Sequence, residues 1–310
     1  MRIAVLGVGG VGGYFGGRLA DAGEDVVFIA RGTHLDALRS TGLRVDSIAG
    51  DFHVQPVSAT DDPAEVGPVD AVLLGVKAWQ VPEAAQAMGP LMGQDTFVVP
   101  LENGVEAPSQ LSEALGSEHV LGGLCAIISF ISGPGHITHA GYEPSVAFGE
   151  LDNRRSQRAE RLRDAFTRAG VKAEIPEDIH VAMWRKFLFI SGFGGVASVV
   201  QLPAGGWRSV EPTRALLQSA FEEVDAIARA AGIHLPADAV ASALNTVDGL
   251  PGDGTASMQR DITDGKPSEI EAQTGAIVRL GRTYGVPTPV NDFIYAALIP
   301  RERRARSQVE

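Results

Sequence analysis

The sequence is poor in cysteine. Its 310 residues include a single one, Cys125, so no disulfide can form within the chain, which favours a reducing compartment such as the cytoplasm. Cys125 stands in the apolar run VLGGLCAII. There we expect a small buried side chain rather than a nucleophile.

Long apolar runs and an excess of positive charge are also missing. No window approaches the roughly 18 uninterrupted apolar residues of a membrane span, and glycines break the apolar start MRIAVLGVGGVGG too early for a signal peptide. Lys and Arg number 26 against 38 Asp and Glu, a formal net charge of −12. This balance argues against a nucleic acid or an anionic membrane as partner. We therefore expect a soluble cytoplasmic protein.

What the chain does contain is short apolar runs in its first half and helical patterns in its second. The runs at 3–6, 26–30, 71–76 and 96–101 alternate with helical segments, which is typical of a parallel sheet covered on both faces. Three further strands are expected in VLGGLCAIISF, GHITHAG and SVAFGEL. The pattern predicts an α/β fold, in which a Rossmann-type doubly wound domain at 1–174 precedes an all-helical domain at 175–310.

The helical domain is predicted from segments of helical pattern that often begin near a proline. One of these predicted helices covers 268–284, and the last covers 288–299. We expect the basic tail RERRARSQVE to be a solvated end rather than a binding arm.

A glycine fingerprint follows the first apolar run. GVGGVG at 7–12 fits G-x-G-x-x-G between a strand and a helix, the context in which this motif binds a dinucleotide. The glycines allow the tight turn, the approach of the backbone to the pyrophosphate and close helix packing. A glycine-rich turn without a ligand is the blander alternative. The candidate cofactor-binding residues here are Gly7, Val8, Gly9, Gly10, Val11 and Gly12.

Arg31 occupies the position that distinguishes the two nicotinamide cofactors. It follows the second predicted strand, where no Asp or Glu is present to accept a hydrogen bond from a ribose 2′-hydroxyl. The planar guanidinium suits a 2′-phosphate. We therefore predict NADP rather than NAD.

Polar residues also follow the two other strands of the predicted sheet. Lys77 comes after the run 71–76, and Asn103 comes after 96–101. The carboxyl ends of parallel strands hold the ligand in open α/β sheets. We therefore expect Lys77 near the cofactor phosphates or ribose and Asn103 near the nicotinamide ribose or the substrate. Each alone could be an ordinary loop residue.

The segment VAMWRKFLFISGF at 181–193 carries two cations within an apolar helix. The helical neighbours of Lys186 and Arg185 are all apolar, and a buried cation is costly unless it is paired or used. One alternative is that one or both side chains reach the surface on their long stems. The other is a function for Lys186, with Arg185 as a structural ion-pair partner.

Together these motifs resemble the ketopantoate reductases (2-dehydropantoate 2-reductases), within the 6-phosphogluconate-dehydrogenase-like superfamily. The resemblance covers nearly the whole chain, in order and spacing. It rests on GVGGVG at 7–12, Arg31, VKAWQ at 76–80, ENG at 102–104, WRKF at 184–187, SMQRDI at 257–262 and KPSEIE at 266–271. It implies NADPH-dependent reduction of a 2-oxo acid, at a site between a Rossmann domain and a helical domain.

The resemblance also implies roles for individual residues. Lys186 would be the general acid, Asn103 would bind both ligands, Ser257 would bind the substrate, and Glu269 would lie close to the substrate and the cofactor ribose. A lysine in an apolar setting can protonate the alkoxide formed by hydride addition, and its charge stabilises that oxyanion. From the sequence alone, Glu269 and Glu271 would both be explained by a helix N-terminus; the motif alone selects Glu269.

The chain departs from the family at three positions that usually carry asparagine. They are Ile190, Gly194 and, by a looser alignment, Ala204. Those amides would hold the carboxylate and hydroxyl of the substrate, so their absence leaves the identity of the substrate open. Ser191 is one candidate to replace part of them.

We therefore predict an NADPH-dependent reductase of 2-dehydropantoate in pantothenate and coenzyme A biosynthesis. One alternative is a paralogous reductase of a different, less polar 2-oxo acid or ketone, and another is a non-catalytic NADP-binding regulator. The long apolar C-terminal helices suggest a homodimer. No metal site is predicted, because His136 and His139 lie three apart on a strand and so on opposite faces.

Overall fold

The computed structural model describes residues 1–308 of the chain. These residues form two compact units. The first comprises residues 1–102 and 107–182, and the second comprises 103–106 together with the described residues from 183 onward.

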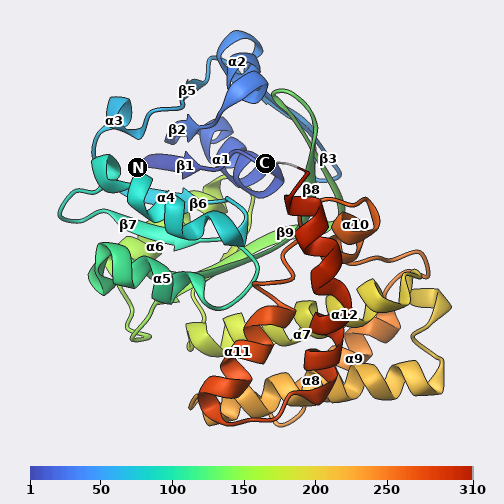
Figure 1. Cartoon of the computed structure of the whole chain (residues 1–310). Helices are drawn as coiled ribbons and strands as arrows, with labels where there is room; N and C mark the ends of the chain where they lie inside the picture. The colour runs from blue at the N-terminus through green and yellow to red at the C-terminus, as the bar shows by residue number, and fades with distance from the viewer. Residues whose placement is uncertain (309–310) are drawn as a thin grey trace. The chain divides into compact units, whose positions relative to one another are not determined.

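The first unit is built on a parallel five-stranded sheet with the order β5-β2-β1-β6-β7 (Figure 1). All four pairings are parallel, so the α/β prediction is confirmed. From β1 the strand order runs one way through β2 to β5 and the other way through β6 to β7, so the topological switch point lies between β1 and β6. Ligands of open α/β sheets bind at such a switch point. The strands are β1 (Arg2–Leu6), β2 (Asp25–Ile29), β5 (Ser58–Thr60), β6 (Ala71–Leu74) and β7 (Phe97–Pro100).

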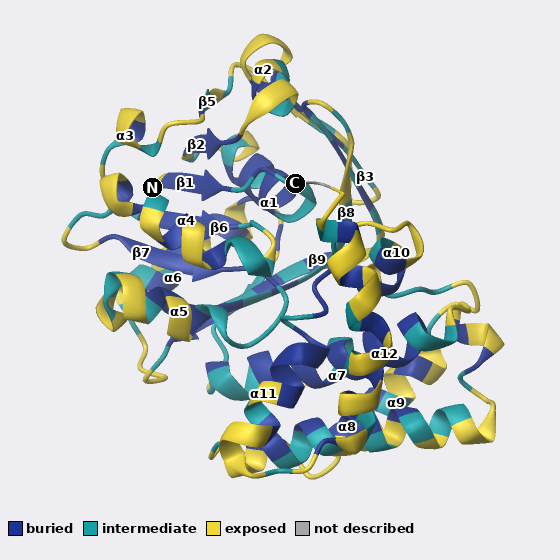
Figure 2. Ribbon diagram, in the orientation of Figure 1, coloured by how far each residue is buried: buried dark blue, intermediate teal, exposed yellow. Residues whose placement is uncertain are grey.

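Alternate residues of these strands enter two different cores. Ile3 and Val5 of β1 pack with Phe15 of the first helix, whereas Ala4 and Leu6 pack with residues of the helices on the other face. Burial on both faces explains why β1, β2, β6 and β7 read as continuous apolar runs, and Figure 2 colours these four strands almost wholly as buried. The helices of this unit are α1 (Gly10–Asp21), α2 (Gly32–Thr41), α3 (Pro63–Val66), α4 (Val81–Ala87), α5 (Ala107–Leu115) and α6 (Gln157–Arg168), with short 3₁₀ turns η1 (Ala78–Gln80), η2 (Gly89–Leu91) and η3 (Ser117–His119).

A second, mixed sheet completes this unit. Two of the three expected strands turned out to be one: GHITHAG and SVAFGEL form a single long strand, β9. Its pairing with β8 is irregular between Ala126 and Ile128, so Gly141 and Pro144 are accommodated at a bulge rather than in a turn. The strands are β3 (Leu43–Ser47), β4 (Phe52–Val54), β8 (Leu121–Gly133), β9 (His136–Glu150) and β10 (Lys172–Glu174).

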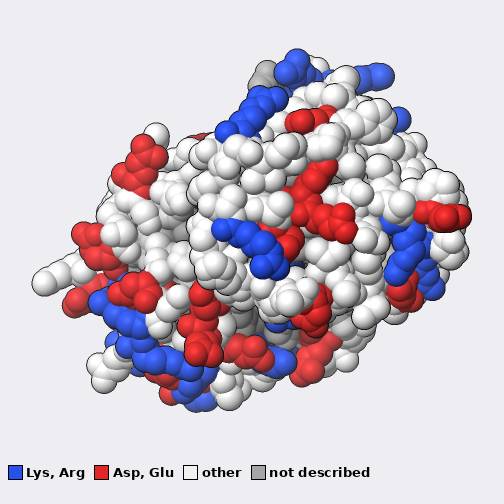
Figure 3. Space-filling model, turned by 90° about the horizontal axis from the view of Figure 1, so that it is seen from below, with Lys and Arg blue, Asp and Glu red and all other residues white. Residues whose placement is uncertain are grey.

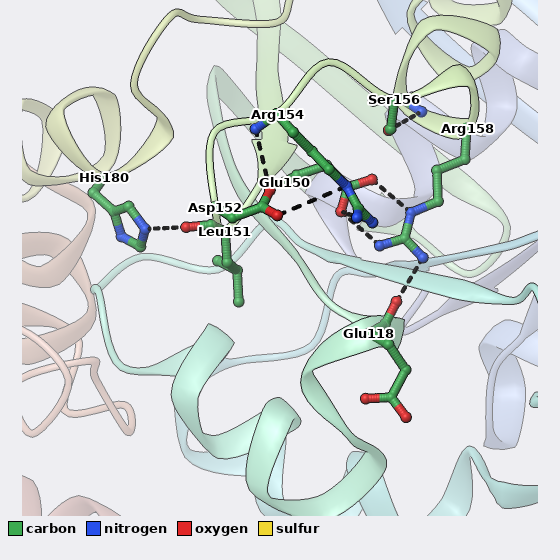
Figure 4. Close-up of polar contacts among 9 residues, drawn as sticks. Glu118, Glu150, Leu151, Asp152, Arg154, Ser156, Arg158 and His180 are labelled. Atoms are coloured by element: carbon green, nitrogen blue, oxygen red, sulfur yellow. Dashed lines mark hydrogen bonds and ion pairs between the residues drawn. The ribbon is translucent and has the colours of Figure 1, made fainter.

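An ion-pair cluster joins β9 to α6 (Figure 4). The carboxylate of Glu150, which is 4% exposed, accepts hydrogen bonds of 2.7 and 2.6 Å from the Arg158 guanidinium. Arg158 also donates to the carbonyl oxygen of Glu118 at 2.6 Å. Burial alone would raise the pKa of Glu150, but the bonds from Arg158 outweigh it and lower that pKa below its ordinary value.

The second unit is helical, as predicted. Its helices are α7 (Ile179–Val200), which begins in the first unit, α8 (Glu211–Ala230), α9 (Ala239–Gly249), α10 (Ser257–Thr263), α11 (Thr274–Tyr284) and α12 (Pro289–Arg306), with a 3₁₀ turn η4 (Ala204–Gly206). Gly192 lies against the ring of Phe221, and Gly195 lies against Ile294. These glycines let α8 and α12 pack close to α7.

Two predicted boundaries in this unit are wrong. The helix expected over 268–284 begins only at Thr274, because residues 269–273 form a turn in which the Glu269 carbonyl accepts from the N–H groups of Ala272 and Gln273. The basic tail is largely exposed but helical, since α12 continues to Arg306 and buries Glu302 at 2% exposure. The last two residues of the predicted tail, 309–310, lie outside the described range.

Charged side chains of both signs are interspersed on the face shown in Figure 3. Within residues 1–308, no helix is both long enough and apolar enough to cross a membrane.

Candidate active site

The glycine fingerprint lies where the sequence places it, between β1 and α1. Gly7 has φ +94°, and a Cβ there would lie 2.7 Å from the backbone nitrogen of Val76. Gly9 precedes the first turn of α1, and the nearest atom to a Cβ at that position, the Gly75 carbonyl oxygen, is 4.0 Å away. The open space at Gly9 and the N–H groups at the start of α1 fit a dinucleotide pyrophosphate.

Arg31 directly precedes α2, at the carboxyl end of β2. Its side chain is 76% exposed and lies 3.4 Å from a carboxylate oxygen of Glu83, which is itself 68% exposed. An ion pair between such exposed groups is weak. The guanidinium is therefore available to bind a phosphate.

Lys77 follows β6 and precedes the η1 turn. Its backbone N–H donates to Oε1 of Gln80 at 3.1 Å, and its ammonium lies 5.8 Å from the centre of the Trp79 ring. Gly7, Arg31 and Lys77 thus follow three neighbouring strands of one parallel sheet, at its carboxyl edge.

The four residues predicted to handle the substrate belong to the second unit. They are Asn103, Lys186, Ser257 and Glu269. Asn103 donates a 2.8 Å hydrogen bond from its amide to Oε2 of Glu269. Glu269 is 7% exposed. It lies in the turn before α11, which begins at Thr274. Glu269 is therefore not in the first turn of a helix, where the alternative interpretation placed it.

Glu271, which the sequence did not distinguish from Glu269, has different surroundings. Its carboxylate accepts from the Tyr295 hydroxyl at 2.8 Å and from Arg279 at 3.2 Å. Burial and the hydrogen bond to Glu271 raise the pKa of Tyr295. Glu271 is thus held by a surface hydrogen-bond network, whereas Glu269 accepts a hydrogen bond from Asn103.

Lys186 and Arg185, neighbours on α7, differ in how far they are exposed. Lys186 is half-buried, and Arg185 is exposed. Among the described residues of the second unit no ion pair involves Arg185, so the structural ion pair expected for it is not formed within that unit. The Arg185 side chain reaches the surface, as expected if a long cationic side chain extends out of an apolar helix.

Two of the positions that lack asparagine, Ile190 and Gly194, follow Lys186 on α7. Ile190 lies one turn after Lys186 and is half-buried. A Cβ at Gly194 would lie 3.3 Å from the Cε of Met258 and 3.8 Å from the Cβ of Ala256. Ala256 and Met258 flank Ser257, which is exposed at the start of α10.

Gln273 was not predicted as a site residue. Its Oε1 lies 3.3 Å from the position of a Cβ at Gly194, and the residue is 2% exposed. Its place could not be read from helical periodicity, because it belongs to the turn before α11. Ala204 is fully buried in η4.

Metal ligands are not gathered in the described part of the chain: no three His, Cys, Asp or Glu residues there could hold an ion. His136 bonds to Asp46 at 2.8 Å, and His139 bonds to the Ser47 hydroxyl at 2.8 Å. Cys125 is buried at 5% exposure.

Comparison with known proteins agrees with this architecture. The family model "Ketopantoate reductase PanE/ApbA" matches residues 3–153, and "Ketopantoate reductase PanE/ApbA C terminal" matches 178–302. The chain is 33% identical to the "Uncharacterized oxidoreductase YkpB" of Bacillus subtilis, over 96% of this chain and 98% of that one. It is 29% identical to the 2-dehydropantoate 2-reductase of Mesorhizobium japonicum, over 96% of both.

A solved structure is equally similar. The crystal structure of a PanE/ApbA family ketopantoate reductase from Ralstonia eutropha JMP134 superposes with a TM-score of 0.90 at 33% identity, covering 99% of this chain and 100% of that one.

The Rossmann-like sheet with its glycine turn, followed by a helical unit, defines an NAD(P)-dependent oxidoreductase acting on CH–OH groups. The chain belongs to the ketopantoate reductase family.

Proposed function

We propose that the protein reduces 2-dehydropantoate to pantoate with NADPH, in pantothenate and coenzyme A biosynthesis, with Lys186 as the general acid. The observation that supports this most is the 2.8 Å hydrogen bond between Asn103 and Glu269. It joins two of the proposed ligand-binding residues in the unit that also carries Lys186 and Ser257.

The first unit would hold the cofactor. The open backbone at Gly9 and the start of α1 fit the pyrophosphate, and the exposed guanidinium of Arg31 fits a 2′-phosphate. Lys77 would bind cofactor phosphates or ribose. When bound, NADPH supplies the hydride that adds to the C2 carbonyl carbon of the substrate.

The second unit would hold and protonate the substrate. Lys186 donates a proton from Nζ to the carbonyl oxygen as that oxygen gains the electron pair of the broken π bond, so the ketone becomes a secondary alcohol. The same charge stabilises the oxyanion in the transition state. Asn103 and Glu269 would orient each other, and Ser257, which is exposed at the start of α10, would bind the substrate.

A second candidate function is reduction of a less polar 2-oxo acid. Ile190 and Gly194 favour it, because neither offers a polar side chain where the family usually has asparagine. A purely NADP-binding regulator is disfavoured, because such a protein has no use for the half-buried Lys186. The homodimer suggested by the apolar C-terminal helices stays a prediction.

The test is NADPH oxidation, followed by nicotinamide absorbance, with 2-dehydropantoate beside a panel of other 2-oxo acids. We expect the highest kcat/KM for 2-dehydropantoate. A clear preference for 2-oxo acids with purely hydrocarbon side chains would favour the second candidate, and turnover of no substrate despite NADPH binding would favour the regulator.

A further inference from the structure

Two glutamines are buried in the second unit, and they differ in the hydrogen bonds that their side-chain amides form. Gln259, 5% exposed, uses both ends: Nε2 donates to the Leu202 carbonyl at 3.0 Å, and Oε1 accepts from the Ala256 N–H at 3.2 Å. Gln273 is buried more deeply, at 2% exposure. Among residues 1–308 no hydrogen bond is formed by its side-chain amide. The amide atoms of Gln273 are nevertheless not among the fully buried, unsatisfied atoms of the described residues. They therefore reach solvent, where a ligand group can take the place of water.

The Gln273 side chain occupies space that exists because residue 194 is a glycine. Its Oε1 lies 3.3 Å from where a Cβ of residue 194 would be, so any side chain there would press on it. Gly194 lies two turns after Lys186 on the same side of α7. The other nearest atoms to a Cβ at Gly194 belong to the apolar side chains of Met258 and Ala256.

The backbone of Gln273 is fixed by the turn that carries Glu269. The Gln273 N–H donates to the Glu269 carbonyl at 3.0 Å, and α11 starts at the next residue. One short turn therefore presents a carboxylate to Asn103 and an amide to Gly194. The turn thus fixes the backbone position of Gln273 relative to that of Glu269.

We propose that Gln273 is a specificity-determining residue, whose amide binds a hydroxyl at the end of the 2-oxo acid remote from the reacting carbonyl. This inference rests on the function proposed above, for which the group is the terminal hydroxyl of 2-dehydropantoate. A separation of eight helical residues, about 12 Å along the axis, places Gly194 too far from Lys186 for both to contact one carbonyl oxygen. A neutral amide both donates and accepts, which matches a hydroxyl.

The test uses a pair of substrates that differ only in that hydroxyl. Trimethylpyruvate is 2-dehydropantoate without it. The ratio of kcat/KM for 2-dehydropantoate to that for trimethylpyruvate is measured for the wild type, for Gln273→Met and for Gln259→Met. The second variant is the matched control, because it removes a buried glutamine amide whose bonds are internal.

We expect Gln273→Met to lower the ratio by about 10- to 100-fold, through loss of activity on 2-dehydropantoate, with trimethylpyruvate little affected. Gln259→Met should lower thermal stability and leave the ratio unchanged. A wild type that uses both substrates, with a ratio that Gln273→Met does not alter, would overturn the inference while the proposed function stands. A wild type that reduces neither would overturn both.

Discussion

The amide of Asn103 and the carboxylate of Glu269 form a 2.8 Å hydrogen bond across 166 residues of sequence. Asn103 is part of a four-residue segment, 103–106, that belongs to the helical unit although the chain on both sides of it belongs to the Rossmann-like unit. A further bond holds this segment, since Arg279 of α11 contacts Glu106 at 2.7 Å. The loop after β7 is thus a structural part of the proposed substrate-binding unit.

The first prediction concerns coupling between these two residues. We expect Asn103→Ala and Glu269→Gln each to lower kcat/KM for the 2-oxo acid. Combined, they should cost less than the sum, because both remove the same hydrogen bond; the coupling should be about 0.5–3 kcal/mol. Glu271→Gln is the matched control, since Glu271 bonds Tyr295 and Arg279 instead. Strict additivity for Asn103 and Glu269 in steady-state kinetics would contradict the pairing.

A second prediction concerns cofactor choice. Arg31→Ala should reduce the preference for NADPH over NADH by about 10- to 100-fold, because charge-assisted hydrogen bonds to a phosphate are lost. Glu83→Gln should leave NADPH binding equal or slightly tighter, since it releases Arg31 from its exposed ion pair. Fluorescence titration with both cofactors measures this, and an unchanged ratio in Arg31→Ala would remove Arg31 from the cofactor site.

The third prediction concerns the anchor beneath Glu269. Glu302 of α12 accepts from the N–H and hydroxyl of Ser268, at 2.8 and 2.6 Å, and pairs with Arg306 at 2.6 Å. Glu302→Ala should lower the free energy of unfolding by about 3–5 kcal/mol, because it removes the acceptor of both Ser268 donors and the buried carboxylate that pairs with Arg306.

Urea denaturation measures that loss. The comparison is Glu174→Ala, which breaks the exposed pair with Lys172 at 3.1 Å. It should cost no more than about 1 kcal/mol. Equal effects of the two substitutions would mean that Glu302 does not anchor the turn.

The fourth prediction concerns acid stability of the first unit. The pKa of Glu150 is lowered in the folded state, so its contribution to stability is fully present above the unfolded pKa of about 4.3 and is lost as the pH falls through the folded value. Glu150→Gln should therefore be less stable than the wild type at neutral pH, and the difference should shrink below about pH 4. Unfolding followed over a pH series measures this; a difference independent of pH would contradict it.

Local patterns made the parallel sheet and the glycine turn predictable. Buried parallel strands are continuous apolar runs, and the fingerprint needs only its flanking strand and helix to be recognised. Arg31 and Lys77 were also identified from the sequence as strand-end residues, because the position of a residue at a strand end follows directly from the strand itself.

The features that the sequence did not predict depend on contacts between residues far apart in the chain. A turn at 269–273 precedes α11, although Pro267 is typical of a helix start. The helix α12 extends into the basic tail because Glu302 accepts a hydrogen bond from Ser268, 34 residues earlier. The role inferred for Gln273 depends on the absence of a side chain at Gly194, 79 positions away in sequence. No periodicity carries such information.

The central claim is that Lys186 protonates the reduced carbonyl, and it is tested most directly by kcat for 2-dehydropantoate in wild type, Lys186→Ala and Arg185→Ala. Lys186→Ala should lower kcat by about 10²–10⁴-fold with NADPH binding retained. Arg185→Ala, which removes the neighbouring exposed cation, should remain close to wild type. Turnover by Lys186→Ala within a few-fold of the wild type would contradict the account.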